Sequence, residues 1–221
     1  MRGQLHPSPH QSFQRQAQGF QLFNCPYFGE VQITTTEYCY KSYVFQNAAA
    51  SVLLPVALGT AVGYSTRPKD TQNTYAAIKN PPGRPPAWVF GPVWTLLYGA
   101  MGYAAYRAVN TGLSPLSTVE HINMTKQGAT LYTIQLGLNL IWMPLFFGLK
   151  RPIEATADIV ALVGINAYLT YLWGSVDRVA GALLAPYVAW LGFATYLSAG
   201  AGYLNNWDLK AAEAKATAKK D

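Results

Sequence analysis

The chain has 221 residues, of which 51% are hydrophobic and 12% are charged, whereas about 25% of the residues in ordinary globular proteins are charged. Too few charges are present to coat a water-soluble surface, which excludes an ordinary soluble domain. The net charge of +6 suits loops that meet anionic lipid headgroups, and we expect no nucleic acid partner.

The charged residues are gathered in clusters that leave five long uncharged stretches between them. These stretches are 42–66, 85–106, 127–149, 159–176 and 179–207. Each is long enough for a helix to cross a bilayer, which takes about 17–25 residues. Ten-residue strands with the alternating pattern of a membrane barrel are absent. We therefore predict an all-α membrane protein, a bundle of five transmembrane helices within 42–207. A buried soluble helix is the alternative for 159–176, the shortest stretch.

Residues 1–41 form an N-terminal extension rich in Gln, Pro and His, with no acidic residue before Glu30. We expect this extension to be disordered or to act as a targeting segment, with disorder favoured because it contains few Arg residues. Cys25 and Cys39 lack the CxxC spacing, and prolines separate the histidines near the start of the chain. We therefore expect no metal site here.

The first span contains Gly59 and Gly63, which form a GxxxG pattern. Small residues at this spacing allow two helix backbones to approach closely in lipid. We predict that this face of the span packs against a neighbouring helix.

The second span begins with helix breakers. Pro85 and Pro86 suit a helix start, because the first helical N–H groups have no partner in any case. Pro92 lies deeper in the span, where it removes one backbone hydrogen bond and favours an opening between helices.

One face of the second span carries large side chains. Trp94, Tyr98, Met101 and Ala105 follow one another at spacings of four, three and four, which places them on the same side of a helix. On spacing alone we favour a packed helix interface or an aromatic belt at the headgroups; the alternative is a face that presents an indole and a phenol to a ligand.

The third and fifth spans carry matching features. Gln135 and Asn139 share a face of the third span, and amides at membrane depth must pair with other groups or line a site. In the fifth span, Trp190 is followed by Ala194 and Ser198 at helical spacing, which leaves a slot beside the indole. Interhelical packing explains these residues as well as ligand contact does, so both interpretations stay open.

Lys and Arg predict the orientation of the chain. The first loop at 65–85, the turn at Lys150 and Arg151, and the charged C-terminal tail at 208–221 carry ten of these residues, and the opposite side carries six. We therefore predict that the first loop and the C-terminus are cytosolic.

Three segments of the chain, in order, are PPGRPPAWVFGPVWTLLYGAMGY, LYTIQLGLNLIWMPLFFG and APYVAWLGFATYL. They resemble the TspO/MBR family of translocator proteins and tryptophan-rich sensory proteins, from about Leu53 to Asn206. The resemblance implies five transmembrane helices, with a long first loop over a pocket that accepts porphyrins, sterols or synthetic isoquinoline and benzodiazepine ligands.

The resemblance also implies which residues form the pocket. They are Phe90, Gly91, Val93, Trp94, Tyr98, Asn139, Trp142, Pro144, Ala157, Ala161, Trp190, Ala194 and Leu197. Trp94 and Trp190 match the two tryptophans that bacterial relatives are thought to use in light-dependent porphyrin breakdown.

The chain departs from the family pattern at three places. Gly83 and Glu154 stand where many relatives carry Trp, so we expect a less aromatic and more polar edge of the pocket. The proposed cholesterol motif near the C-terminus is not preserved, because Ala199 stands at the position of its tyrosine and Lys210 lies one residue too far along. Sterol transport is therefore not inferred from that motif.

The resemblance implies an integral membrane protein that binds tetrapyrroles such as protoporphyrin or haem, or sterols, as a sensor, scavenger or carrier. The alternatives are transport of porphyrin or sterol across the membrane, light-dependent porphyrin degradation, and a scaffold for partner helices. Since no span contains His, a haem iron would lack its commonest ligand, and metal-free rings should bind nearly as well. We expect no required cofactor and no hydrolytic or kinase chemistry.

The family resemblance also bears on place and assembly. It implies a multi-pass protein of the mitochondrial outer membrane, with the endoplasmic reticulum or Golgi as the alternative. Membrane lipid surrounds such a chain, and some relatives form homodimers.

Overall fold

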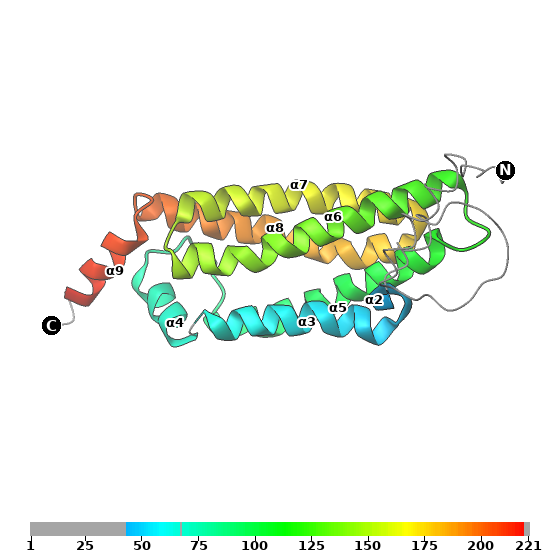
Figure 1. The fold of residues 1–221 in the computed structure, drawn as a ribbon. Coiled ribbons are helices and arrows are strands. Elements are labelled where there is room, and N and C mark those ends of the chain that lie inside the picture. Colours follow the sequence, from blue (N-terminus) through cyan, green and yellow to red (C-terminus); the bar gives the residue numbers. More distant parts are fainter. Residues whose placement is uncertain (1–42, 67, 219–221) are drawn as a thin grey trace, which may run out of the picture. The chain divides into compact units, whose positions relative to one another are not determined.

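The computed structural model describes residues 43–66 and 68–218. The predictions made for the N-terminal extension, 1–41, lie outside these residues. In the described part of the chain every regular element is a helix, and there is no strand (Figure 1).

Five long helices form the body of the protein. They are α3 (Ala48–Ser65), α5 (Ala87–Gly112), α6 (Val119–Met143), α7 (Pro152–Val176) and α8 (Arg178–Leu204). Helix α6 continues into a π-helical turn, η3 (Pro144–Gly148). The shorter helices are α2 (Tyr43–Gln46), α4 (Pro68–Ala77) and α9 (Leu209–Ala218).

Four of the long helices are apolar enough to cross a membrane: α3, α6 together with η3, α7 and α8. Helix α5 has 26 residues and is therefore also long enough. Its Trp, Tyr, Gly and Pro residues score as weakly hydrophobic although they are common in membrane helices. Because α5 packs against α3, α6 and α8, the chain is an all-α membrane bundle of five long helices, as predicted.

The helices extend beyond the uncharged stretches that predicted them. Helix α5 continues past Arg107 to Gly112, and α7 begins at Pro152 and so includes Glu154 and Asp158. Arg107 is accommodated because its guanidinium forms an ion pair with Asp177, at a distance of 2.9 Å, where α7 meets α8. A charge near a helix end thus finds a partner at the end of the bundle instead of stopping the helix.

Close approach between helices depends on small residues. A Cβ atom at Gly59 would lie 2.2 Å from the Tyr98 ring, so the predicted packing of the first span is confirmed at Gly59. Gly63, the other glycine of the same pattern, has no described atom within 4 Å of such a Cβ position. On α8, a Cβ atom at Gly202 would meet the ring of Trp207, which belongs to the turn after the helix, at 2.4 Å.

The first loop, the turn after η3 and the C-terminal segment meet at one end of the bundle (Figure 1). Ile78, Phe146 and Leu209 are buried together there. Glu213 of α9 pairs with Lys150 and also accepts a hydrogen bond from Thr74 of α4 at 3.1 Å. The region predicted as a charged tail therefore contains a helix that is docked onto the rest of this end.

Candidate functional site

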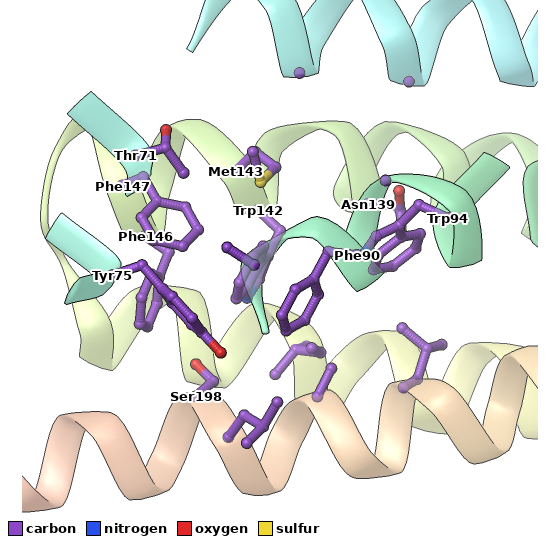
Figure 2. A pocket seen from close by; sticks show the side chains of 18 of the residues that line it. Thr71, Tyr75, Phe90, Trp94, Asn139, Trp142, Met143, Phe146, Phe147 and Ser198 are labelled. Atoms are coloured by element: carbon purple, nitrogen blue, oxygen red, sulfur yellow. The ribbon is translucent and has the colours of Figure 1, made fainter. Parts of the chain in front are cut away.

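A cavity of about 540 Å³ lies among the five long helices, next to α4. Aromatic residues form much of its wall: Tyr64, Tyr75, Phe90, Trp94, Tyr98, Trp142, Phe146 and Phe147. Its other polar side chains are Thr60, Thr71, Asn80, Thr95, Asn139 and Ser198. Figure 2 shows the rings of Tyr75, Phe90 and Trp142 around the same space. No charged side chain lines the cavity within the described residues.

The structure brings eight of the predicted pocket residues together in this wall: Phe90, Gly91, Trp94, Tyr98, Asn139, Trp142, Ala194 and Leu197. They come from α5, α6 and α8, at positions that each helix places on one face. The wall therefore contains the predicted indole of the second span and the small residue that follows Trp190 in the fifth.

Five predicted residues lie elsewhere. Val93 and Trp190 are half-buried against the core, and the Trp190 ring contacts Phe90 with 5.9 Å between ring centroids. Trp190 thus supports the wall from behind Phe90. Ala157 and Ala161 are exposed on the outer face of α7, where lipid would meet them. Pro144 begins η3 instead of lining the cavity.

Helix α7 reaches the cavity through Ile159 and Leu162. These residues lie on the same face as the fully buried Asn166, at four and seven positions before it. An amide in a membrane helix faces the bundle interior, so Asn166 was the signal that could have identified this face from the sequence. The resemblance predicted Ala157 and Ala161 instead, which lie on the exposed side of the same helix.

The deep end of the cavity is closed by hydrogen bonds between four helices. The Tyr98 hydroxyl donates to Asn139 Oδ1 at 2.5 Å, and Asn139 Nδ2 donates to the Tyr187 hydroxyl at 2.9 Å. The Tyr187 hydroxyl in turn donates to Gln135 Oε1 at 3.0 Å, and Asn166 Nδ2 approaches the same oxygen at 3.4 Å. Both open interpretations therefore apply: Gln135 joins helices, and Asn139 joins helices and lines the cavity.

Aromatic contacts fix the wall above this network. The Trp94 ring lies 5.6 Å from the Tyr98 ring, and Trp142 stacks on Phe146 with centroids 5.1 Å apart and an angle of 15°. The indole N–H groups of Trp142 and Trp190 are buried and have no acceptor among the described residues. These two donors are therefore unsatisfied among the described residues, although an indole N–H usually has an acceptor when it is buried.

The π-helical turn explains why Phe146 and Phe147 point into the cavity. Pro144 lacks the N–H that would continue α6, and the Leu149 N–H donates to the Pro144 carbonyl at 2.8 Å, one residue farther than in an α-helix. The wider turn directs both phenylalanine rings toward the space next to Trp142. No sequence signal other than Pro144 marked these two residues.

The segment after α4 covers one edge of the cavity. The Tyr75 hydroxyl donates to the Pro85 carbonyl at 2.9 Å, and Arg84 Nη1 donates to the Tyr75 carbonyl at 2.9 Å. The Arg84 guanidinium also lies 4.8 Å from the centroid of the Tyr75 ring. Burial raises the pKa of Tyr75, although the positive charge of Arg84 opposes this rise. The positive charge of Arg84 therefore lies beside the edge of the cavity, whose described wall contains no charged side chain.

Among the described residues, no group of three or more His, Cys, Asp or Glu side chains could hold a metal ion. The chemistry that the cavity offers is consequently stacking, apolar contact and a few hydrogen bonds. These are the means by which proteins hold flat organic ligands.

Comparison with known proteins agrees with this architecture. A model described as the TspO/MBR family matches residues 51–204, which run from the first turn of α3 to the end of α8. The chain is 42% identical over 163 residues to the "Translocator protein homolog" of Schizosaccharomyces pombe, with 73% of this chain and 94% of that protein covered.

Two further relatives come from more distant organisms. The "Tryptophan-rich protein TspO" of Archaeoglobus fulgidus is 39% identical over 156 residues, which cover 71% of this chain and 95% of that protein. The "Translocator protein" of Homo sapiens is 37% identical over 153 residues, with 68% and 85% covered. Helix α9 lies outside the matched family region.

Proposed function

Since the chain belongs to the TspO/MBR family, we propose that it binds a flat, largely apolar ligand in the cavity, as a sensor, scavenger or carrier in the membrane. The ligand classes are tetrapyrroles, such as protoporphyrin and haem, and sterols. The observation that carries the proposal is the aromatic cavity of about 540 Å³ closed at depth by the hydrogen bonds of Tyr98, Asn139 and Tyr187.

The shape and chemistry of the wall favour a planar ring system. Trp94 and Trp142 present ring surfaces, and their neighbours Tyr98 and Phe146 hold them in place. Cavities of this size are typical of sites for small organic molecules. A ligand lying between these rings would gain stacking and apolar burial without any charged partner in the wall.

The edge of the cavity favours a tetrapyrrole over a sterol. Arg84 stands beside the wall residue Tyr75, where its guanidinium is available to the propionate groups of a porphyrin. A sterol has no carboxylate to use this cation. Since no His among the described residues lines the cavity, stacking would hold the ring, and we expect protoporphyrin and haem to bind with similar affinity.

Two other functions stay open within the same proposal. A transporter would move the porphyrin or sterol across the membrane, and a porphyrin-degrading protein would use Trp94 and Trp190 under illumination. Phe90 of α5 contacts Trp190 of α8 and lies one turn before Trp94 on its own helix. Both indoles are therefore close to one wall residue. Illumination of the bound complex, followed by analysis of the pigment, separates degradation from binding.

The location of the protein is also a proposal. The family resemblance leads us to propose the mitochondrial outer membrane, with the endoplasmic reticulum or Golgi as the alternative. The distribution of Lys and Arg leads us to propose a cytosolic C-terminus. Homodimer formation, as in some relatives, stays a prediction.

Titration with protoporphyrin tests the proposed ligand. Purified protein should bind protoporphyrin with quenching of tryptophan fluorescence, and Trp94→Ala should weaken the affinity about tenfold because one stacking surface is lost. Trp88→Ala is the matched control, since Trp88 lies in the same helix, is 75% exposed and does not line the cavity. Equal affinities for the wild-type protein and the Trp94 variant would contradict the proposal, and cholesterol in the same assay tests the sterol class.

A further inference from the structure

Helices α3 and α5 are in tight contact over one part of their length. A Cβ atom at Gly102 would lie 2.2 Å from the Ser51 carbonyl oxygen, and one at Gly59 would lie 2.2 Å from the Tyr98 ring. The two helix surfaces therefore leave no room for a side chain at these levels. This contact closes the seam between α3 and α5 on the side away from α4.

The same seam is open farther toward α4. Gly63 lies one turn beyond Gly59 on α3, and Gly91 lies about two turns beyond Tyr98 on α5 in the same direction. A Cβ atom at either glycine would meet no described atom of another helix within 4 Å, although both glycines line the cavity. The two helices thus separate at the level of the cavity, and glycine leaves the opening without side chains.

Exposure of the lining residues marks the same place. Five residues line the cavity and are also exposed, and all of them belong to α3 or α5: Thr60, Tyr64, Ala87, Gly91 and Thr95. Lining residues of α7 and α8 are buried or half-buried instead, as Ile159, Leu191 and Ser198 illustrate. The cavity wall is therefore closed toward α7 and α8 and open between α3 and α5.

The described residues that border the opening include no charged side chain. The Thr60 hydroxyl donates to the Val56 carbonyl at 2.7 Å, and the Thr95 hydroxyl donates to the Gly91 carbonyl at 2.9 Å. Each hydroxyl is thus satisfied within its own helix and does not join α3 to α5. Since α3 is apolar enough to cross a membrane, this side of the cavity meets acyl chains.

The opposite route, past α4, is held by several polar contacts. Tyr75 donates to the Pro85 carbonyl, Arg84 donates to the Tyr75 carbonyl, and Glu213 of α9 accepts from Thr74. A ligand that left through this end would have to break these contacts. A ligand that left between α3 and α5 would pass two threonine hydroxyls that are bonded within their own helices, the phenol of Tyr64 and otherwise apolar groups.

From these observations we propose that the cavity exchanges its ligand with the bilayer through a side window between α3 and α5, bordered by Thr60, Gly63, Tyr64, Ala87, Gly91 and Thr95. The inference rests on the proposed function and adds the source of the ligand, which is a planar apolar molecule dissolved in the membrane. Water-soluble molecules of similar size would not reach the cavity by this path.

Kinetics of protoporphyrin exchange in phosphatidylcholine liposomes test the window. Gly91→Leu and Gly63→Leu place a bulky side chain in the opening, and each has room for its Cβ atom, so folding should be kept. We expect association and dissociation of protoporphyrin both to become about tenfold slower, because the leucine narrows the path into the cavity. Gly192→Leu is the matched control, because Gly192 is exposed on α8, has the same free space and does not line the cavity.

The remaining outcomes distinguish the window from the proposed function. Normal binding with unchanged rates in both window variants would overturn the window alone. Faster dissociation in these variants would also overturn it, because the leucine would then be displacing the ligand instead of blocking its path. If the wild-type protein in liposomes did not bind protoporphyrin, the result would contradict the proposed function itself. The window would then have no ligand to admit.

Discussion

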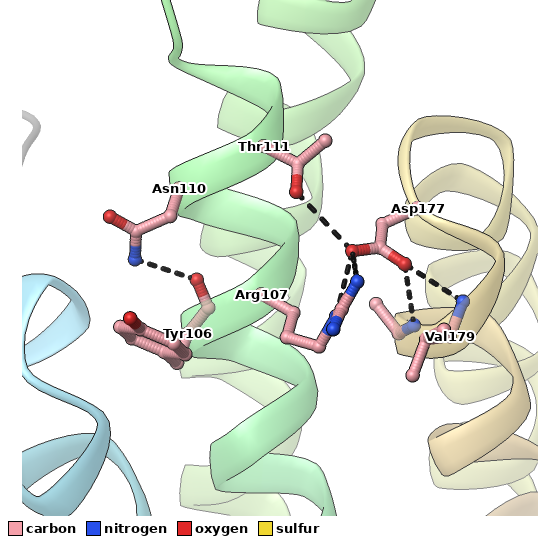
Figure 3. A network of polar contacts seen from close by, with 7 residues as sticks. Tyr106, Arg107, Asn110, Thr111, Asp177 and Val179 are labelled. Carbon is pink, nitrogen blue, oxygen red and sulfur yellow. Dashed lines mark hydrogen bonds and ion pairs between the residues drawn. The ribbon is translucent and has the colours of Figure 1, made fainter.

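At each end of the bundle a single residue joins neighbouring helices, and Asp177 is the clearest case (Figure 3). Asp177 Oδ2 pairs with Arg107 of α5 at 2.9 Å, and Oδ1 accepts the Val179 N–H at the start of α8 at 2.8 Å. One carboxylate thus caps a helix and ties it to another. Burial alone would raise the pKa of Asp177, but the hydrogen bonds from Arg107, Val179 and Ala180 outweigh it and lower the pKa.

This pKa predicts how stability depends on pH. A carboxyl group with a lowered pKa in the folded state stabilises the protein above its unfolded pKa and loses that effect as the pH falls through its folded value. Asp177→Asn should therefore unfold at a lower temperature than the wild-type protein at pH 7, and the difference should shrink below about pH 4. Thermal unfolding in detergent measures it, and a difference that stays constant down to pH 3 would contradict the assigned ion pair.

At the scale of elements, the C-terminal helix α9 restrains α4, which lies next to the cavity. Leu209 of α9 is fully buried against the end of the bundle, and Glu213 joins Thr74 of α4 to Lys150 of the turn after η3. The hydrogen bond from Lys150 lowers the pKa of Glu213. The restraint joins α9, which lies beyond the matched region, to Thr74 and Lys150 inside that region.

Hydrogen exchange tests the restraint. Glu213→Gln removes the carboxylate charge that pairs with Lys150 and accepts the hydrogen bond from Thr74. The backbone amides of α4 should therefore exchange several-fold faster, as measured by mass spectrometry. In the wild-type protein the same acceleration should appear as the pH falls through the lowered pKa of Glu213, after correction for the intrinsic exchange rate. Glu120→Gln, at the exposed start of α6, is the control, and equal exchange of α4 in both variants would refute the restraint.

For the whole molecule, the arrangement of charges makes a prediction about orientation. The hydrogen bonds between Lys79 and Asn205 and the pair of Lys150 with Glu213 bring the first loop, the turn and the C-terminal segment to one end. The pair of Arg107 with Asp177 lies at the other end, where α7 meets α8. The groups that sequence counting assigned to one side are therefore together in the structure.

Labelling of single cysteines tests which end is cytosolic. In a chain with Cys25→Ser and Cys39→Ser, we expect Ala214→Cys to react with a bulky, impermeant maleimide once the plasma membrane is opened. Leu116→Cys, which is 96% exposed between α5 and α6, should react only after detergent is added. The reverse pattern would show that the C-terminus faces away from the cytosol.

The sequence by itself determined the five helices and much of the wall, because both depend on information along one helix. Uncharged stretches of sufficient length specify spans, and the helical period places Trp94 and Tyr98, or Ala194 and Ser198, on one face. Asn139 followed from the cost of an unpaired amide in lipid. Its two partners, Tyr98 and Tyr187, did not, because pairing depends on distances between helices.

Only the tertiary structure decided how the helices are rotated and where they part. It turned Ile159 and Leu162 of α7 toward the cavity in place of Ala157 and Ala161, since Asn166 on the same face bonds inward. It also separated Gly63 from α5 while Gly59 stayed in contact, although the two glycines form one pattern in the sequence. A local pattern states which residues share a face, but the opening of a cavity depends on the spacing of neighbouring helices, which no single segment encodes.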